Sequence, residues 1–137
     1  MNDGPVVIVD DDQDDLDIVT EVWNELGYKN KLVFFHSAES ALHFIETDPT
    51  VPFLIVCDVN VPRMGGFELK RRVLGVDNLY YKSIPFVFWS TQASREQIRK
   101  AYDLCVNGLF IKGSSMQEVK ASFKAIAEYW LRSIVPE

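Results

Sequence analysis

Four kinds of side chain in this sequence could together bind a divalent cation and a phosphoryl group. Asp10 and Asp11 stand in one acidic run, and Asp58 is a separate acid much later in the chain. Carboxylates brought close together either rise in pKa or require a cation, and Mg²⁺ suits a few carboxylates, a backbone carbonyl and several waters. The ammonium of Lys112 and the hydroxyl of Ser90 would complete a cradle for a tetrahedral dianion. Asp58 would then be the nucleophile that forms an acyl phosphate.

The chain also indicates which elements would position these residues. Five short apolar runs, rich in β-branched and aromatic residues, are typical of strands covered on both faces of a parallel sheet. They span residues 6–9, 32–35, 53–57, 86–89 and 109–111. Five segments with the apolar spacing of helices follow them in turn, at 14–26, 38–46, 66–74, 94–105 and 115–130. This alternation predicts an α/β fold with a doubly wound, five-stranded parallel sheet.

The polar residues stand at the ends of four of these predicted strands. Asp10–Asp12 follow the first run, Asp58 follows the third, Ser90 and Thr91 follow the fourth, and Lys112 follows the fifth. In an open, doubly wound sheet, ligands bind in the crevice at the carboxyl ends of the strands. We therefore expect these side chains to converge on one pocket.

Each residue also has an ordinary structural interpretation when it is taken alone. An acidic run is usually a solvated face, and we expect Asp14, Asp15 and Asp17 only to complement the dipole of the following helix. An isolated aspartate such as Asp58 is often a turn residue, and an isolated lysine such as Lys112 is usually on the surface. The occurrence of all these residues together, in strand order, favours a site.

Composition and spacing limit the classes of function. The 137 residues carry a net charge of −6, which is unfavourable for binding a nucleic-acid backbone. Because no apolar run could cross a bilayer and no signal-peptide pattern is present, we expect a cytoplasmic protein that does not bind membranes. Cys57 and Cys105 lack the spacing of a metal site and predict small buried residues in a reducing compartment.

The last two predicted helices begin with the spacing of a capping box, in which a serine and a residue three positions later bind each other's backbone. Ser94 pairs with Gln97 in this way, and Ser115 pairs with Glu118. The final helix carries an apolar stripe that ends in Trp130. A homodimer through this helix is an alternative use of its aromatic residues, but burial of Trp130 in the core is the simpler interpretation.

Taken together, these motifs resemble the receiver domain of two-component response regulators. Asp10 and Asp11 match the family's acidic pair after the first strand. Residues 57–66, Cys-Asp-Val-Asn-Val-Pro-Arg-Met-Gly-Gly, resemble its phosphoacceptor segment. Ser90 and Lys112 stand where the family keeps a hydroxyl and a lysine.

The resemblance extends from residue 6 to about residue 131 and implies a flavodoxin-like (βα)₅ fold with strand order 2-1-3-4-5. It implies that residues 1–137 form a single stand-alone receiver domain, similar to chemotaxis regulators, with no output domain. The implied function is phosphorelay signalling by a phosphoacceptor switch that is not an enzyme. The implied partners are a sensor histidine kinase or histidine phosphotransfer protein as donor, and a downstream target protein.

The resemblance also implies a role for each acidic residue. Asp58 would accept the phosphoryl group from a phosphohistidine. Asp11 and Asp58 would bind Mg²⁺ directly, and Asp10 would bind it partly through water. Asn60 would contribute its backbone carbonyl to the same ion.

The remaining implied roles concern the phosphoryl group and the switch. Lys112 would pair with phosphoryl oxygens, and Ser90 would turn inward to hydrogen-bond them, assisted by the Thr91 amide. Asn60 and Gln92 would flank the entry of hydrolytic water. Phosphorylation would bias the loops after the fourth and fifth strands and switch a contact surface formed by the fourth helix, fifth strand and fifth helix.

Two positions depart from the family pattern. Gly113 follows Lys112 where most receivers have proline, so the usual reason for a cis peptide bond is missing. Leu109, with Phe110 beside it, stands where the family tends to place a tyrosine or phenylalanine that acts as a rotamer switch. An aromatic switch of that kind is therefore not predicted.

Two alternative functions share parts of the pattern. One is a small Mg²⁺-dependent phosphatase with an aspartate nucleophile, whose chemistry resembles that of haloacid dehalogenases. Such an enzyme needs a second aspartate two positions after the nucleophile as general acid, and Asn60 stands there. The other is a degenerate receiver that acts only as a binding module.

Overall fold

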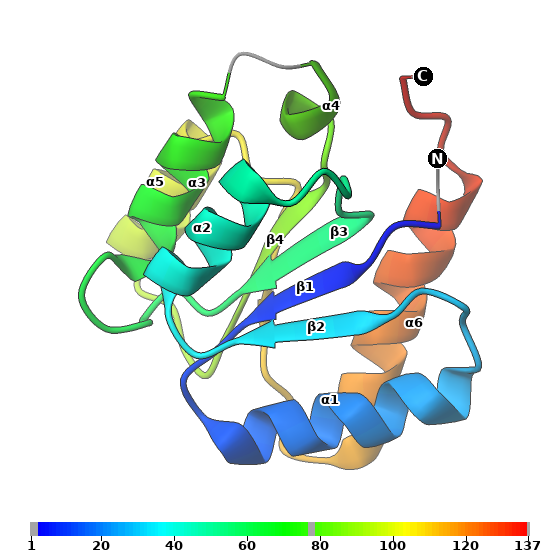
Figure 1. Ribbon diagram of the computed structural model, residues 1–137. Helices are drawn as coiled ribbons and strands as arrows, with labels where there is room; N and C mark the ends of the chain where they lie inside the picture. The colour runs from blue at the N-terminus through cyan, green and yellow to red at the C-terminus, as the bar shows by residue number, and fades with distance from the viewer. Residues whose placement is uncertain (1–2, 77–78, 137) are drawn as a thin grey trace.

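A five-stranded parallel sheet forms the middle layer of the computed structural model, which describes residues 3–76 and 79–136 (Figure 1). The sheet order is β2-β1-β3-β4-β5, as predicted. The strands are β1 (Val6–Val9), β2 (Leu32–Phe35), β3 (Leu54–Cys57), β4 (Phe86–Ser90) and β5 (Gly108–Ile111). The helices are α1 (Gln13–Leu26), α2 (Ala38–Thr47), α3 (Gly65–Leu74), α4 (Leu79–Lys82), α5 (Arg95–Asp103) and α6 (Met116–Arg132).

Helices cover the sheet on both faces, which explains why the strands are apolar without alternation. Helices α1 and α6 pack on one face against Ile8, Val56 and Trp89. Helices α2, α3 and α5 lie on the other face (Figure 1). Val9 and Phe88 belong to the core on that side. Neighbouring positions of one strand therefore serve different cores, and all four positions of β1 and of β3 are buried.

Helix ends follow the predicted capping residues with one exception. Ser94 and Gln97 form the full reciprocal capping box at the start of α5. Ser115 accepts a hydrogen bond from the Glu118 N–H at the start of α6, but the Glu118 carboxylate binds Ser114. The second capping box is therefore only half formed, because the Glu118 carboxylate accepts hydrogen bonds from the Ser114 N–H and hydroxyl instead of from the Ser115 N–H.

Three details differ from the sequence expectations. The single-turn helix α4 was not predicted, since four residues are too few to show a helical period. In α5 only Ala101 is buried, and Tyr102 of its predicted apolar stripe is 57% exposed. Cys57 is buried as expected, but Cys105 is exposed and has a left-handed backbone with a φ of 60°, just beyond the end of α5.

The long helices of the described region do not include one that could span a membrane. In α6 Trp130 packs at the edge of the core, as preferred from its spacing, while the neighbouring Tyr129 is 67% exposed.

Candidate functional site

The carboxyl ends of four strands bring the predicted polar residues together. Asp10 follows β1, Asp58 follows β3, Ser90 ends β4 and Lys112 follows β5. Lys112 is tied to this edge by its backbone, since its N–H donates to the Ser90 carbonyl over 2.7 Å. The convergence predicted from the strand ends is therefore present in the fold.

The Lys112 ammonium lies at the centre of the cluster. Its Nζ is 2.8 Å from Asp10 Oδ2, 2.9 Å from Asp58 Oδ2 and 2.7 Å from Asp15 Oδ2. A lysine ammonium has three N–H donors, so each carboxylate takes one of them. The Lys112 side chain is only 8% exposed, and these pairs are therefore weakly screened by solvent.

Asp15 is the site residue that sequence reasoning missed. It was assigned only to the helix dipole, yet its carboxylate makes the shortest of the three contacts with Lys112. Asp15 lies in the first turn of α1, and the loop after β1 aims that turn at the end of β5. The two residues are 97 positions apart in sequence, so no local pattern signals their contact.

Three acids can share a cation. One carboxylate oxygen from each of Asp10, Asp11 and Asp58 lies within 4.8 Å of the others. Asp10 is buried, Asp58 is half-buried and Asp11 is exposed, so the group is open to water on one side. Hard oxygen donors with room for several waters fit Mg²⁺ or a similar divalent ion.

The pKa values of Asp10 and Lys112 both rise, which favours the neutral form of the acid and the charged form of the lysine. Burial raises the pKa of Asp10 from 3.8 to about 6, although its hydrogen bond with Lys112 opposes this. Burial would lower the pKa of Lys112, but hydrogen bonds to Asp10, Asp15 and Asp58 outweigh it and the pKa rises above its usual value. Lys112 therefore stays charged, whereas at Asp10 the cost of burying the carboxylate exceeds the stabilisation that Lys112 provides.

The two oxygens of Asp58 have different partners. Oδ2 accepts from Lys112, while Oδ1 accepts from the Asn60 N–H over 2.9 Å. The Ser90 hydroxyl lies 3.5 Å from Oδ1 and 3.0 Å from the Gln92 carbonyl. A hydroxyl has one hydrogen, so Ser90 donates it to the Gln92 carbonyl, which is the nearer acceptor. Rotation of the Ser90 side chain would direct the hydroxyl to Asp58 instead.

The other predicted residues lie around this centre. Thr91 and Gln92 follow β4 directly after Ser90, and both are exposed. The Asn60 side chain accepts a hydrogen bond from Gln97 Nε2 over 3.3 Å, which links the Asp58 loop to the start of α5. Gln97 was predicted only as a capping residue, and this second contact was not expected.

Trp89 forms an aromatic wall for the site. Its ring centroid is 5.0 Å from Lys112 Nζ, and its ring packs edge-to-face on Phe123 of α6. A cation over an indole ring is attracted by the ring quadrupole. The bulk of Trp89 next to Ser90 is therefore explained by contacts with both the core and the ammonium.

A close approach explains the glycine after Lys112. A Cβ at Gly113 would lie 2.3 Å from Glu118 Cβ, closer than two carbons can pack. Every described peptide bond is trans, including the one between Lys112 and Gly113. At the nearby position that receivers often give to an aromatic, Leu109 packs on the face covered by α2, α3 and α5, and Phe110 packs on the opposite face.

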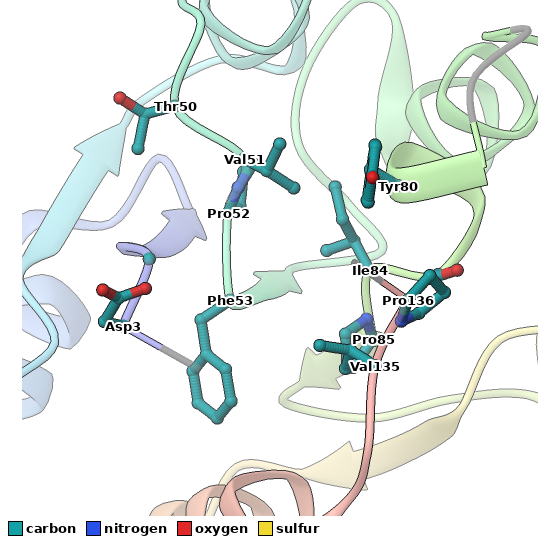
Figure 2. Close-up of a pocket in the computed structure, with 12 residues that line it drawn as sticks. Asp3, Thr50, Val51, Pro52, Phe53, Tyr80, Ile84, Pro85, Val135 and Pro136 are labelled. Carbon is teal, nitrogen blue, oxygen red and sulfur yellow. The ribbon is translucent and has the colours of Figure 1, made fainter. Parts of the chain in front are cut away.

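An apolar cavity lies elsewhere in the described region. It has a volume of about 600 Å³ and is formed by the segments that precede β1, β3 and β4 and by residues 135–136 (Figure 2). Its lining is mainly apolar, including Phe53, Ile84 and Pro85, and Asp3 is its single charged residue. The polar cluster is at the opposite, carboxyl edge of the sheet, so the chemistry does not use this cavity.

Comparison with known proteins agrees with this geometry. Residues 6–124 match the response regulator receiver domain family. Chemotaxis protein CheY from Pseudomonas aeruginosa is 29% identical over 123 residues, which cover 90% of this chain and 95% of that protein.

Solved structures show the same fold. The phosphorylated cyanobacterial phytochrome response regulator RcpA has a TM-score of 0.86 at 24% identity, covering 98% of this chain and 99% of that one. The Mn²⁺-bound form of response regulator Rcp1 has a TM-score of 0.82 at 24% identity, with the same coverage. With the family match over most of its length and an acidic pocket at the expected strand ends, the chain belongs to the response regulator receiver domains, which are phosphoacceptors of phosphorelay signalling rather than enzymes.

Proposed function

We propose that Asp58 is the phosphoacceptor and that its donor is the phosphohistidine of a sensor kinase or phosphotransfer protein. In this reaction an Asp58 oxygen forms a bond to phosphorus while the phosphorus–nitrogen bond breaks, and the histidine nitrogen leaves with the electron pair. The observation that carries the proposal is the position of the Asp58 carboxylate, 2.9 Å from a buried ammonium and beside Asp10 and Asp11.

Asp10, Asp11 and Asp58 would hold Mg²⁺ through their carboxylates, and Asn60 would add its backbone carbonyl. The close approach of the three acids supports this assignment, as does the Mn²⁺-bound form known for Rcp1. When bound, the ion would neutralise the carboxylates and the negative charge of the phosphoryl donor. Without it, three carboxylates repel an anionic substrate.

Three residues of the chain would stabilise the transferred group. Lys112 already directs one N–H at Asp58 Oδ2, and it would donate to a phosphoryl oxygen from nearly the same place. Ser90 would rotate its hydroxyl from the Gln92 carbonyl toward the phosphoryl group. The Thr91 amide would follow, and the loop after β4 would change its conformation.

The test is phosphorylation of the intact protein by acetyl phosphate and Mg²⁺, followed by intact mass spectrometry. We expect one phosphoryl group per chain, its absence without Mg²⁺, and its absence in Asp58→Asn. Asp48→Asn is the matched control, since Asp48 follows α2 and its carboxylate accepts from the Thr50 N–H instead of from Lys112. Equal labelling of the wild type and Asp58→Asn would refute the assignment of Asp58.

We further propose that the phosphorylated form binds a target protein through α5, β5 and α6. Each of these elements exposes a large apolar side chain: Tyr102 of α5 and Ile111 of β5 are more than half exposed, and Met116 of α6 is about one-third exposed. Gln97 links α5 to the Asp58 loop, so a change at the site has a route to this surface. A stand-alone organisation, a cytoplasmic location and a homodimer stay predictions.

The two alternative functions have less support. A phosphatase of this type needs a proton donor at position 60, and the Asn60 amide cannot serve as one. A degenerate receiver would have lost part of the cluster, whereas Asp10, Asp58 and Lys112 are in direct contact. Repeated turnover of a phosphomonoester would favour the phosphatase, and loss of any response to Mg²⁺ would favour the degenerate receiver.

A further inference from the structure

Asp15 contacts the site ammonium from a different direction than the strand-end acids. Asp10 and Asp58 approach Lys112 from the ends of β1 and β3, whereas Asp15 approaches from the first turn of α1. Its carboxylate is the nearest of the three, at 2.7 Å, and is 22% exposed. The three contacts use all the N–H donors of Lys112.

We propose that Asp15 is a positioning residue that fixes the Lys112 ammonium for phosphoryl transfer, a proposal that rests on the proposed function of Asp58. Asp10 and Asp15 hold two of the N–H donors, and the third is thereby aimed at Asp58 Oδ2. When a phosphoryl group is attached to Asp58, that third donor moves to a phosphoryl oxygen without displacement of the side chain.

Lys112 needs a separate partner because Asp10 and Asp58 are candidate ligands for a cation as well as partners of the ammonium. Asp10 and Asp58 belong to the group whose oxygens can share a cation, so a bound ion competes with Lys112 for them. Among the acids that contact Lys112 in the described region, Asp15 alone lies outside that group. It can therefore remain with the ammonium whether or not an ion is bound.

The backbone after Lys112 gives little help in holding the side chain. Gly113 follows it directly, and glycine restricts the chain less than any other residue. The Trp89 ring, 5.0 Å from Nζ, provides an attractive but less directional contact. A carboxylate on a helix is the more rigid support.

Asp14 provides the matched control. It stands in the same helical turn and has the same charge, but its side chain is exposed, and its backbone N–H, which the substitution keeps, donates to Asp12 Oδ1. Asp14→Asn and Asp15→Asn thus change net charge and helix dipole alike, and only Asp15→Asn removes a contact with Lys112. Asp15→Glu keeps the charge on a longer side chain.

The experiment combines a rate with a direct view of the ammonium. Phosphorylation by acetyl phosphate at saturating Mg²⁺ is measured for the full chain and the three variants, and the Lys112 ¹⁵Nζ–¹H resonance is followed by NMR. The resonance is assigned through its loss in Lys112→Arg, and thermal unfolding confirms that each variant is folded.

For Asp15→Asn we expect about a tenfold slower phosphorylation, together with a shifted or broadened Lys112 resonance. We expect Asp14→Asn to stay within about twofold of the wild type, and Asp15→Glu to recover most of the rate. An unchanged Lys112 resonance in Asp15→Asn would overturn the proposal, as would equal rates for the two asparagine variants. If the wild type takes up no phosphoryl group, the proposed function fails, and the resonance still decides whether Asp15 positions Lys112.

Discussion

At the scale of single residues, the site is a balance between one buried ammonium and several carboxylates. Lys112 is paired with Asp10, Asp15 and Asp58, so the acids outnumber the cation even before Asp11 is considered. Buried charges are tolerated only when they are paired. The cost of burial is clearest at Asp10, whose pKa rises to about 6 although Lys112 lies beside it.

This raised pKa predicts how stability depends on pH without Mg²⁺. Between pH 3.8 and about 6 the folded state binds the Asp10 proton more tightly than the unfolded state. The contribution of Asp10 to stability is therefore present at low pH and is lost as pH rises through about 6. Asp10→Asn should be more stable than the wild type by about 1–3 kcal/mol at about pH 7.5, and the gain should shrink near pH 4.

Urea denaturation in EDTA at several pH values checks this prediction. Asp103→Asn is the control, since Asp103 is exposed at the end of α5 and should change stability by less than about 0.5 kcal/mol. A gain for Asp10→Asn that does not vary with pH would contradict the explanation.

Gly113 leads to a second prediction at this scale. An added Cβ would meet Glu118 Cβ at 2.3 Å, so Gly113→Ala should lower the free energy of unfolding by about 1–3 kcal/mol. Gly75→Ala is the matched control, because its Cβ would meet only ordinary contacts at 3.5 Å. That variant should lie within about 1 kcal/mol of the wild type. Chemical denaturation compares the two, and equal stabilities would show that the Glu118 contact is relaxed easily.

At the scale of elements, α5 differs from the other long helices in how little it buries. Only Ala101 is buried, so the helix depends on its N-terminal capping box more than on packing. This weak attachment suits a helix that follows the β4 loop and belongs to the proposed contact surface. Its exposed apolar residues also leave a surface that a partner could cover.

Ser94→Ala should therefore loosen α5 without unfolding the protein. Loss of the cap should cost about 1 kcal/mol, and backbone amides of residues 95–103 should exchange faster with deuterium. Ser37→Ala removes the comparable cap of α2, which buries four residues and should keep most of its protection. Hydrogen exchange with mass spectrometry measures both, and equal protection losses in the two helices would argue against a loosely attached α5.

At the scale of the whole molecule, the fold and the site are coupled through charge. The chain has a net charge of −6, and several of its acids are gathered at one edge of the sheet. A ligand that binds only the folded state stabilises it by mass action. A divalent cation at this edge should therefore stabilise the entire domain.

Thermal unfolding with increasing Mg²⁺ tests this coupling. At a Mg²⁺ concentration about 100 times the Kd, the free energy of unfolding should rise by about 2.7 kcal/mol. Asp11→Asn should lose most of this rise, because it removes one of the three carboxylates that could bind the ion. Sodium chloride at equal ionic strength is the control, and an equal effect of both salts would mean screening instead of a specific site.

The sequence by itself determined the sheet and most of the site. Strands buried on both faces must be apolar at every position, and the polar residue that follows such a run is therefore conspicuous. For this reason the positions of the strands and the meeting of Asp10, Asp58, Ser90 and Lys112 could be predicted, while the strand order followed from the family resemblance.

Only the tertiary structure decided what depends on how elements are rotated and spaced. Whether Asp15 faces solvent or Lys112 is set by the rotation of α1 about its axis, which is fixed by packing against the sheet and α6. The contact of Glu118 with Gly113 and the exposure of α5 have the same origin. Local sequence patterns specify the elements, but contacts between residues about 100 positions apart arise only when those elements pack.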